Sequence, residues 1–243
     1  MKVLLMSSGV TNASIRDALV DLLGKPIEES SALFIVTGMH PFASGPAGAY
    51  RALGGAAQNK MAALGWKSLG LLEPTALPSI DRSTWEPGVL ETDAILVWGG
   101  DPVYLAHWLR LSGLADLLPS MKDAVYVGVS AGAIVTARTF CETYGDPPKR
   151  DGEVLKSETI AWEGADGVTS ANLVTAHGIG LVDFAIIPHY LNPEHGEVTD
   201  VNAERWAAHI PAPTYAIDEA TAIKVVDGVV EVVSEGHWKL FTP

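Results

Sequence analysis

Short, wholly apolar runs alternate along the chain with longer segments in which apolar residues recur at helical spacing. The apolar runs predict buried strands at Lys2–Met6, Ala32–Thr37, Ser68–Leu72, Asp93–Trp98 and Ala124–Val129. The periodic segments predict helices at Ser14–Leu23, Ala49–Leu64, Pro102–Leu111 and Ala131–Thr139. Strands separated by helices pair in parallel, and a strand that is apolar at every position needs cover on both faces. The pattern therefore predicts an α/β fold, a three-layer sandwich around a mostly parallel central sheet.

The last third of the chain changes character. Its structural signals predict a strand at Phe184–Pro188, a helix at Asn202–His209 and a strand at Thr214–Ile217. Two further apolar runs, Ala222–Val226 and Val229–Val233, flank Asp227-Gly228, which is a strong hairpin signal. The fold is therefore expected to end in an antiparallel edge hairpin.

Three stretches rich in glycine, proline or polar residues predict loops, at Gly38–Gly48, Pro74–Gly88 and Glu142–Asp166. The last is the longest, and long loops in compact domains are often functional. The chain has no internal repeat and no low-complexity tract, and 243 residues are within reach of one large domain. We therefore expect a single domain.

The composition excludes several classes of protein. Hydrophobic residues make up 48% of the chain and charged residues 19%, as in globular proteins. The net charge of -13 repels phosphate backbones, so nucleic acid is not an expected partner. No run reaches the roughly 18–20 apolar residues of a membrane span, and the first apolar run ends at Ser7, too early for a secretory signal. The single cysteine, Cys141, fits a reducing compartment, so we expect a cytoplasmic protein with no membrane partner.

The pattern G-x-S-x-G stands at Gly128–Gly132, where a predicted strand runs directly into a predicted helix. Small neighbours permit the sharp turn that exposes the Ser130 hydroxyl above the sheet edge, and the Ala131 N–H at the helix start can stabilise an oxyanion. These residue types are common, and the same pattern could be a Gly-rich turn in which Ser130 serves only as the N-cap of the helix. The position between strand and helix favours a nucleophile.

Gly99-Gly100-Asp101 follows another predicted strand and precedes a predicted helix. A glycine pair lets backbone N–H groups approach a substrate closely, so the Gly100 N–H is the second candidate oxyanion donor. The alternative is a plain strand-to-helix turn with Asp101 as the N-cap, and both interpretations can hold together.

His189 follows the apolar run FAIIP at a further strand end, which makes it the candidate general base. It is one of seven histidines, of which His107, within a predicted helix, and His237, near the last strand, suit structural roles better. His195 follows in HYLNPEH, but the spacing matches no common zinc pattern. We expect neither a metal nor a cofactor.

A histidine base needs a carboxylate to orient it. Asp218 and Glu219 follow the strand predicted to end at Ile217, and Asp146 lies in the polar loop. Each of these carboxylates would equally suit a solvated turn. Spacing alone leaves the choice among them open.

Four segments resemble, in order and spacing, the signature segments of the peptidase E family of aspartyl dipeptidases. They are LLMSSG, WGGDPVYL, VGVSAGA and GIGLVDFAIIPHY, and the likeness covers nearly the whole chain. This combination is much more specific than G-x-S-x-G alone. The wider group includes cyanophycinases, and the fold is similar to that of class I glutamine amidotransferases. The resemblance implies one catalytic domain over residues 1–243.

The resemblance also implies roles for particular residues. Ser130 is the nucleophile, His189 is the base, and the carboxylate of the family maps best onto Glu219. Asp146 is the nearest match to a further functional aspartate, although its surroundings, CETYGDPP, depart from the family pattern. In the family an arginine downstream of the histidine binds the aspartyl carboxylate of the substrate, and Arg205 is the positional candidate. A guanidinium suits this role because it pairs with a carboxylate through two hydrogen bonds, and an exposed helix arginine is the alternative.

Asp101 departs from the family, which usually carries asparagine after the glycine pair. A carboxylate near the oxyanion hole would disfavour an acidic substrate through like-charge repulsion. This departure bears on the preference for aspartate more than on hydrolysis itself.

The combined prediction is a serine peptidase that hydrolyses dipeptides or short peptides after an N-terminal aspartate through an acyl-enzyme. One rival is a cyanophycinase- or isoaspartyl-type serine peptidase with the same chemistry and a different pocket. A second rival is a non-catalytic binding protein on the same scaffold. The expected partner is a small peptide substrate, and the sequence leaves open whether the chain forms a homodimer.

Overall fold

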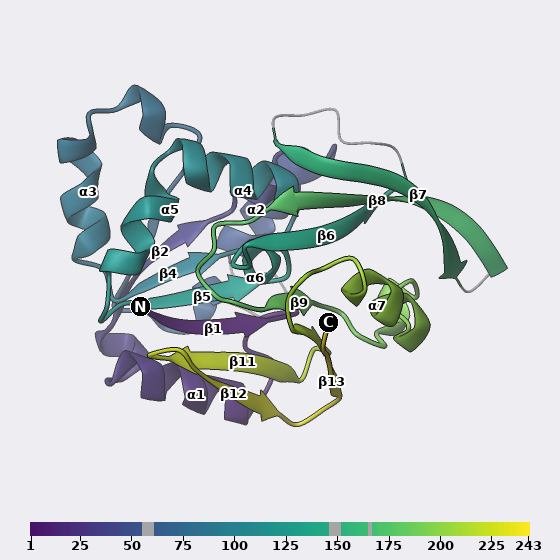
Figure 1. Cartoon of the computed structure of the whole chain (residues 1–243). Helices are drawn as coiled ribbons and strands as arrows, with labels where there is room; N and C mark the ends of the chain where they lie inside the picture. Colours follow the sequence, from purple (N-terminus) through teal and green to yellow (C-terminus); the bar gives the residue numbers. More distant parts are fainter. Residues whose placement is uncertain (55–60, 146–151, 165–166) are drawn as a thin grey trace.

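The computed structural model describes residues 1–54, 61–145, 152–164 and 167–243 (Figure 1). Within these residues the largest sheet has seven strands in the order β12-β11-β1-β5-β4-β2-β3. They are β1 (Lys2–Met6), β2 (Ser31–Ile35), β3 (Ser68–Leu71), β4 (Ala94–Val97), β5 (Val125–Val129), β11 (Thr221–Val226) and β12 (Val229–Ser234). The strands from β1 to β3 pair in parallel, whereas β11 joins β1 antiparallel and continues into β12. The predicted mostly parallel sheet with an antiparallel edge hairpin is confirmed.

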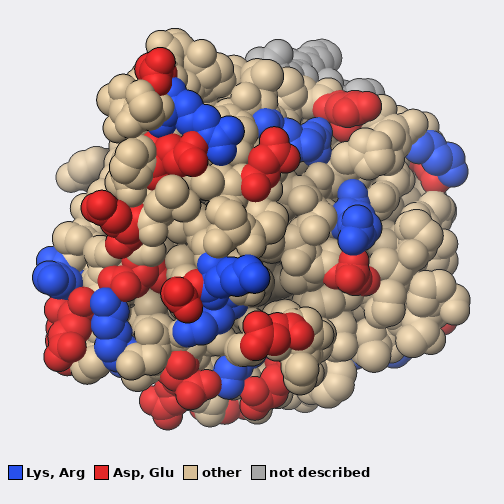
Figure 2. Space-filling model, turned by 60° about the vertical axis from the view of Figure 1, so that its left-hand side comes forward, with Lys and Arg blue, Asp and Glu red and all other residues tan. Residues whose placement is uncertain are grey.

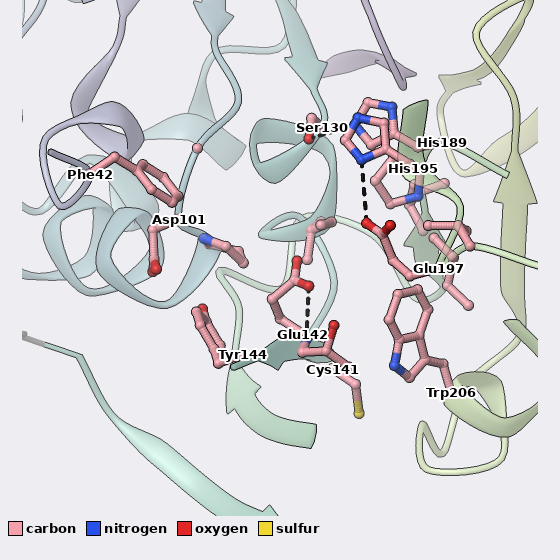
Figure 3. Close-up of a pocket in the computed structure, with 18 residues that line it drawn as sticks. Phe42, Asp101, Ser130, Cys141, Glu142, Tyr144, His189, His195, Glu197 and Trp206 are labelled. Atoms are coloured by element: carbon pink, nitrogen blue, oxygen red, sulfur yellow. Dashed lines mark hydrogen bonds and ion pairs between the residues drawn. The ribbon is translucent and has the colours of Figure 1, made fainter. Parts of the chain in front are cut away.

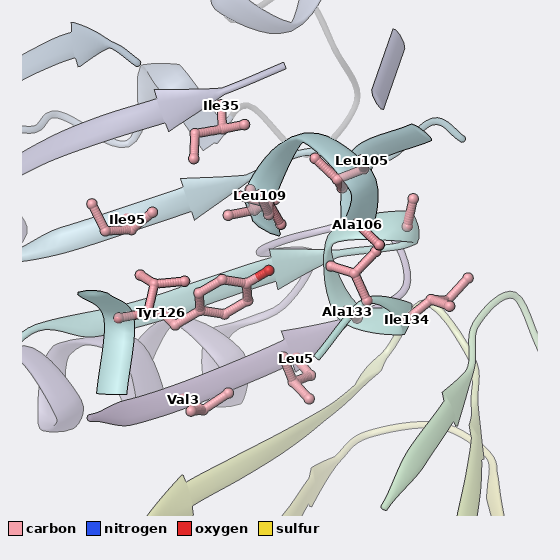
Figure 4. Close-up of a cluster of buried hydrophobic side chains, with 14 of the residues drawn as sticks. Val3, Leu5, Ile35, Ile95, Leu105, Ala106, Leu109, Tyr126, Ala133 and Ile134 are labelled. Carbon is pink, nitrogen blue, oxygen red and sulfur yellow. The ribbon is translucent and has the colours of Figure 1, made fainter. Parts of the chain in front are cut away.

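Helices cover both faces of this sheet. One face carries α1 (Ala13–Leu23) and α2 (Gly45–Leu53), and the other carries α3 (Arg82–Leu90), α4 (Pro102–Leu111) and α5 (Leu114–Leu117). Side chains alternate along β1, so Leu4 packs under the first group of helices and Leu5 under the second. Figure 4 shows the second group, where Leu109 of α4 lies near Tyr126 of β5. The three-layer sandwich is therefore confirmed as well.

Two three-stranded sheets lie beyond the carboxyl ends of the parallel strands (Figure 1). The strands of the first are β9 (Ala185–Ile187), β10 (Thr214–Ile217) and β13 (Trp238–Phe241), and those of the second are β6 (Thr139–Tyr144), β7 (Val154–Gly164) and β8 (Gly167–His177). The helix α7 (Asp200–Ala207) packs against β7 through Trp206 and Trp162, whose ring centroids are 5.0 Å apart. These additions bring the loops after β9 and β10 close to the end of β5.

Two predicted loops contain regular structure. Pro74–Gly88 includes a 3-10 turn and most of α3, and Glu142–Asp166 includes the end of β6 and all of β7. Most described residues of β7 are exposed, and its backbone pairs with β8 along its length. A strand held by backbone pairing rather than by buried side chains has little hydrophobic pattern to detect. In addition, the helix α6 (Ala131–Ile134) is shorter than predicted, because the chain turns after it and starts β6 at Thr139.

The helix α2 begins earlier than predicted, at Gly45 within the expected loop Gly38–Gly48. Pro46 lies in its first turn, where a missing N–H costs nothing. The helix ends at Leu53, and a 3-10 turn at Met61–Ala63 accounts for the described end of the predicted segment. Residues 55–60, and the site candidate Asp146, lie outside the described residues.

Charges of both signs share the surface. Figure 2 shows Lys and Arg side chains lying among Asp and Glu side chains on one face. Ion pairs such as Lys25–Asp93, at 2.9 Å, and Lys224–Asp21, at 2.8 Å, are part of this mixture. In the described part of the chain, no helix combines the length and the apolar character needed to cross a bilayer.

Candidate active site

Ser130 occupies a sharp turn between β5 and α6. Its backbone has φ 51 and ψ −115, a conformation that L residues rarely adopt and that costs about 1–3 kcal/mol. The Ser130 N–H donates to the Met6 carbonyl at 2.9 Å, which ties the turn to the end of β1. The surrounding packing therefore holds the serine in a strained position at the edge of the sheet.

The two glycines of the G-x-S-x-G pattern are required by close backbone approach. A Cβ at Gly132 would lie 2.1 Å from the Val97 carbonyl oxygen, and a Cβ at Gly128 would lie 2.5 Å from the Gly132 carbonyl oxygen. The buried Tyr126 hydroxyl donates to that same Gly132 oxygen at 2.7 Å. Only glycine at both positions lets α6 start directly on top of the sheet.

His189 stands directly over the serine. Its Nε2 is 3.1 Å from the Ser130 Oγ, and its side chain is 15% exposed. The residue follows β9 and has φ 61, another rarely populated conformation. Its N–H donates to the Ser7 Oγ at 3.1 Å, and the buried Ser7 hydroxyl donates to the Ile217 carbonyl at 2.8 Å. Ser7 therefore fixes the strained backbone that aims the imidazole.

Glu219 holds the other side of the imidazole. Its Oε1 is 2.8 Å from the His189 Nδ1, and the Asn192 amide donates to the same oxygen at 2.5 Å. Burial opposes ionisation of this carboxyl, but the hydrogen bonds from His189 and Asn192 prevail and lower its pKa below the usual value. An ionised Glu219 favours the tautomer with the proton on Nδ1, which leaves Nε2 free to accept from Ser130.

Asp218, the neighbouring candidate, faces the other way. Its Oδ1 accepts from the Ala220 N–H at 3.0 Å and from the Thr221 hydroxyl at 2.7 Å, and its Oδ2 accepts from the His237 N–H. It therefore organises the turn between β10 and β11. Of the two carboxylates that the sequence placed after β10, Glu219 is the one in contact with His189.

The glycine pair after β4 passes very close to the serine. A Cβ at Gly99 would lie 3.1 Å from the Ser130 Cβ, and a Cβ at Gly100, whose φ is 131, would lie 2.2 Å from the backbone of Gly38. Asp101 is buried and caps α4, since its Oδ1 accepts from the Tyr104 N–H at 2.9 Å. The glycine pair thus lies close to Ser130, and Asp101 also caps the following helix, so both features expected of this segment are present. Ala131 is the first residue of α6, where an N–H has no partner within its own helix.

A pocket with a volume of ≈ 360 Å³ opens beside Ser130 (Figure 3). Apolar and aromatic side chains form most of its walls, among them Phe42, Ile134, Tyr144, Ile187, Val198 and Trp206. Its polar side chains include those of Asp101, Glu142, His195 and Glu197. Burial raises the pKa of the Glu142 carboxyl to about 7; the Thr143 N–H opposes this shift, and the charge of Glu197 adds to it.

Two histidine rings stack in this pocket. The ring of His195 lies 4.0 Å from that of His189 at an interplanar angle of 11°, and its Nδ1 is 3.4 Å from the Glu197 Oε1. Ser7, Asn192, His195, Glu142 and Glu197 were not predicted as site residues. Two of them could have been found from their nearness to His189 in the sequence, since Asn192 and His195 lie three and six residues after it in HYLNPEH.

Arg205 does not line this pocket. It lies on α7, and one guanidinium nitrogen is 3.5 Å from the Ala161 carbonyl of β7, whereas the adjacent Trp206 turns its ring into the pocket. The structure therefore brings together Ser130, His189 and Glu219, with Gly100 and Ala131 close by, and leaves Arg205 apart. The described residues contain no group of three His, Cys, Asp or Glu side chains placed to hold a metal ion.

A family model for peptidase family S51 matches residues 3–233. The chain belongs to peptidase family S51. The matched residues include the whole site, from Ser7 to Glu219.

Two relatives carry peptidase names. A Drosophila melanogaster protein named "Probable alpha-aspartyl dipeptidase" is 27% identical over 164 residues, which are 64% of this chain and 59% of that protein. A Listeria monocytogenes protein named as an uncharacterized peptidase is 27% identical over 150 residues, which are 58% of this chain and 62% of that protein. The match thus spans about three fifths of the length of these curated relatives.

Two solved structures share the fold of this S51 chain. One is described as a putative peptidase E protein from Listeria monocytogenes EGD-e, with a TM-score of 0.62 at 17% identity over 97% of this chain and 98% of that chain. The other is a peptidase from an acI-B1 Actinobacterium, with a TM-score of 0.59 at 18% identity over 99% of this chain and 93% of that chain. At these identities the likeness concerns the fold.

Proposed function

We propose that the protein is a serine peptidase that cleaves short peptides through an acyl-enzyme, with Ser130, His189 and Glu219 as its triad. The observation that carries this proposal is the continuous line of contacts from Glu219 to the His189 Nδ1, at 2.8 Å, and from the His189 Nε2 to the Ser130 Oγ, at 3.1 Å. Nucleophile, base and orienting acid in this order define triad chemistry on any fold. The strained turn at Ser130 supports the same assignment as a nucleophile elbow.

The steps follow from these contacts. Ser130 Oγ attacks the scissile carbonyl carbon while His189 Nε2 takes the hydroxyl proton, and Glu219 stabilises the resulting imidazolium. The N–H groups of Gly100 and Ala131 stabilise the oxyanion, each contributing about 3 kcal/mol. The tetrahedral intermediate collapses as His189 returns the proton to the leaving amine. Water, deprotonated by the same nitrogen, then releases the acyl group from Ser130.

The small size of the pocket supports short substrates, because about 360 Å³ accommodates one or two residues rather than a folded chain. Aspartyl dipeptidase activity is a second, finer candidate, favoured by the name of the Drosophila melanogaster relative. Cyanophycinase- or isoaspartyl-type hydrolysis would use the same three residues, and β-linked aspartyl substrates would distinguish it.

The experiment compares wild type with Ser130→Ala on free dipeptides and on the p-nitroanilides of aspartate, lysine, leucine and alanine. We expect Ser130→Ala to lose at least about 10³-fold in kcat/KM on every substrate that wild type cleaves. Ser79→Ala, at an exposed serine in the 3-10 turn Leu77–Ser79, is the matched control and should retain full activity. Equal cleavage by Ser130→Ala and wild type would refute the proposal.

A further inference from the structure

Asn192 forms hydrogen bonds to three parts of the candidate active site. Its side-chain amide donates to the Glu219 Oε1 at 2.5 Å, its N–H donates to the His189 carbonyl at 3.1 Å, and its carbonyl accepts from the His195 N–H at 2.9 Å. These partners are the orienting acid, the base and the residue whose ring stacks on the base. Asn192 therefore connects the groups that surround the catalytic imidazole.

The contacts of the Asn192 amide determine which of its ends faces Glu219. Its Oδ1 accepts from the Glu194 N–H at 2.9 Å, so the NH₂ group is the end that points to the carboxylate. A rotated amide would place Oδ1 against a carboxylate oxygen and the NH₂ group against an N–H, and both pairs would repel. The Oδ1 contact also caps the 3-10 turn Pro193–His195, which carries the stacked ring.

The turn from His189 to Asn192 has a strained backbone. His189 has φ 61 and Leu191 has φ 59, in the left-handed region that residues with a Cβ rarely adopt. The Asn192 N–H closes this turn on the His189 carbonyl, and the Tyr190 N–H donates to the Ile217 carbonyl at 3.0 Å. Such backbone persists only where several contacts hold it together. The turn thereby keeps the Asn192 amide beside Glu219.

Glu219 Oε1 has two hydrogen-bond partners that approach from different residues. The His189 Nδ1 lies 2.8 Å away and the Asn192 amide 2.5 Å away. The terminal torsion of a glutamate is broad, so one partner alone leaves the carboxylate free to tilt, and the second restricts it. Burial raises the pKa of Glu219, but the hydrogen bonds from His189 and Asn192 outweigh burial and lower it, which keeps the acid ionised.

We propose that Asn192 is a positioning residue for the triad, because its NH₂ group holds the Glu219 carboxylate against the His189 Nδ1. The inference rests on the proposed serine peptidase function and adds a residue to its machinery. The structural alternative is that Asn192 only caps the turn Pro193–His195. The two roles need different ends of the amide, since capping uses Oδ1 and positioning uses the NH₂ group.

Asn192→Asp separates these two roles. An aspartate is a good N-cap and keeps an oxygen for the Glu194 N–H, but when ionised it cannot donate to Glu219 and adds like charge beside it. At pH 8 we expect Asn192→Asp to lower kcat about 10–100-fold with little change in KM, because the base is no longer held in place. A residue that acts only as a cap would leave kcat of Asn192→Asp at the wild-type value.

Two further variants complete the kinetic comparison. Asn192→Ala loses both ends of the amide and should lower kcat about tenfold or more, again with little change in KM. Asp81→Ala is the matched control, because Asp81 is an exposed N-cap of α3 whose side chain accepts from the Ser83 N–H at 2.9 Å. It removes a cap of the same kind outside the candidate site and should retain full activity.

The pH profile of kcat/KM gives a readout that a capping role would not move. Its acidic limb reports protonation of the base, and a second carboxylate near the imidazole favours the imidazolium. The limb should therefore move to higher pH by about one unit in Asn192→Asp. Other described titratable side chains line the pocket with His189 or lie beside this pair in the sequence, and they are Asp101, Cys141, Glu142, Tyr144, Glu194, His195, Glu197 and Asp218. They are the same in every variant, so a shift belongs to position 192.

A measurement without turnover separates this inference from the proposed function. The histidines are labelled with nitrogen-15, and the signals of His189 are assigned by their absence from His189→Gln. The chemical shifts of the two ring nitrogens report which of them carries the proton. We expect the form with the proton on Nδ1 to dominate in wild type and to lose this dominance in Asn192→Ala, whether or not any peptide is cleaved.

The outcomes distinguish the inference from the mechanism on which it rests. Wild-type kcat, pH profile and tautomer in both Asn192 variants would overturn the inference and leave the serine mechanism standing. Full activity in Ser130→Ala would refute the mechanism, and the comparison of tautomers would still decide whether Asn192 positions His189.

Discussion

The imidazole of His195 lies parallel to that of His189, with ring centroids 4.0 Å apart and an angle of 11° between the planes. His189 is already held from the far side by Glu219 and from its backbone by Ser7. The ring of His195 therefore lies against one face of the His189 imidazole. We infer that His195 helps to position the proposed base.

Replacing His195 should loosen the base without removing it. We predict that His195→Ala lowers kcat about tenfold, because small misplacements of a catalytic group are costly, and changes KM much less. His177→Ala, at an exposed histidine at the end of β8, is the matched control. Steady-state kinetics of both variants give kcat and KM. An unchanged kcat in His195→Ala would show that the stacking of His195 on His189 has no positioning role.

Glu219→Gln should impair the chemical step severely. The amide cannot stabilise the imidazolium, and its NH₂ group can turn towards Nδ1 and favour the wrong tautomer of His189. We predict a loss of about 10²–10⁴-fold in kcat with the fold intact. Asp218→Asn is the comparison, since Asp218 organises a turn and does not touch His189. A larger loss of kcat in the Asp218 variant, measured per folded molecule, would reverse the assignment.

Gly132→Ala should destabilise the protein and disturb the serine turn. The added Cβ would lie 2.1 Å from the Val97 carbonyl oxygen, so either α6 or β4 must shift. We predict a loss of about 1–3 kcal/mol in the free energy of unfolding, together with a large loss of activity. Gly88→Ala is the matched control, because nothing lies within 4 Å of a Cβ there and the residue is within α3. Urea unfolding of both variants should show destabilisation in Gly132→Ala alone.

The carboxyl of Glu142 should make stability depend on pH. Its pKa is about 7 in the folded protein against a usual value of 4.5, so between these values the folded state binds a proton that the unfolded state has released. Wild type should therefore lose stability as pH rises through this window, by about 1–3 kcal/mol relative to Glu142→Gln. Urea unfolding at pH 4.5 and pH 7.5 measures this difference.

Among the described residues, the other titratable side chains that line the pocket are Asp101, Cys141, Tyr144, His189, His195 and Glu197. They are present in both proteins, so comparing wild type with Glu142→Gln isolates the contribution of this one carboxyl. Parallel pH dependence in the two proteins would contradict the raised pKa of Glu142.

The parallel sheet and the position of Ser130 between a strand and a helix could be predicted, because local sequence determines both. A strand such as Ala94–Val97, which is apolar at every position, is buried on both faces. The glycines on either side of Ser130 allow the sharp turn from strand to helix. The choice between Asp218 and Glu219 could not be predicted. Neighbouring residues point in different directions, and the turn into β11 decided which one met His189.

The meeting of Glu142 and Glu197 in the pocket could not be predicted from local sequence either. Glu142 belongs to β6, which lay in a predicted loop, and Glu197 meets it only because two separate segments fold over the end of β5. Arg205 illustrates the opposite case. Its position in the sequence suggested a substrate contact. In the structure, the next residue of α7, Trp206, lines the pocket and packs on Trp162, whereas Arg205 lies beside β7.

The most direct test of the central claim is covalent labelling of the nucleophile. Wild type and Ser130→Ala are incubated with a fluorophosphonate, and the labelled peptide is mapped by mass spectrometry. The account predicts one label, on Ser130, that forms in step with the loss of peptidase activity and is absent from Ser130→Ala. A protein that hydrolyses peptides while its Ser130 stays unlabelled and another residue carries the phosphonate would contradict the account.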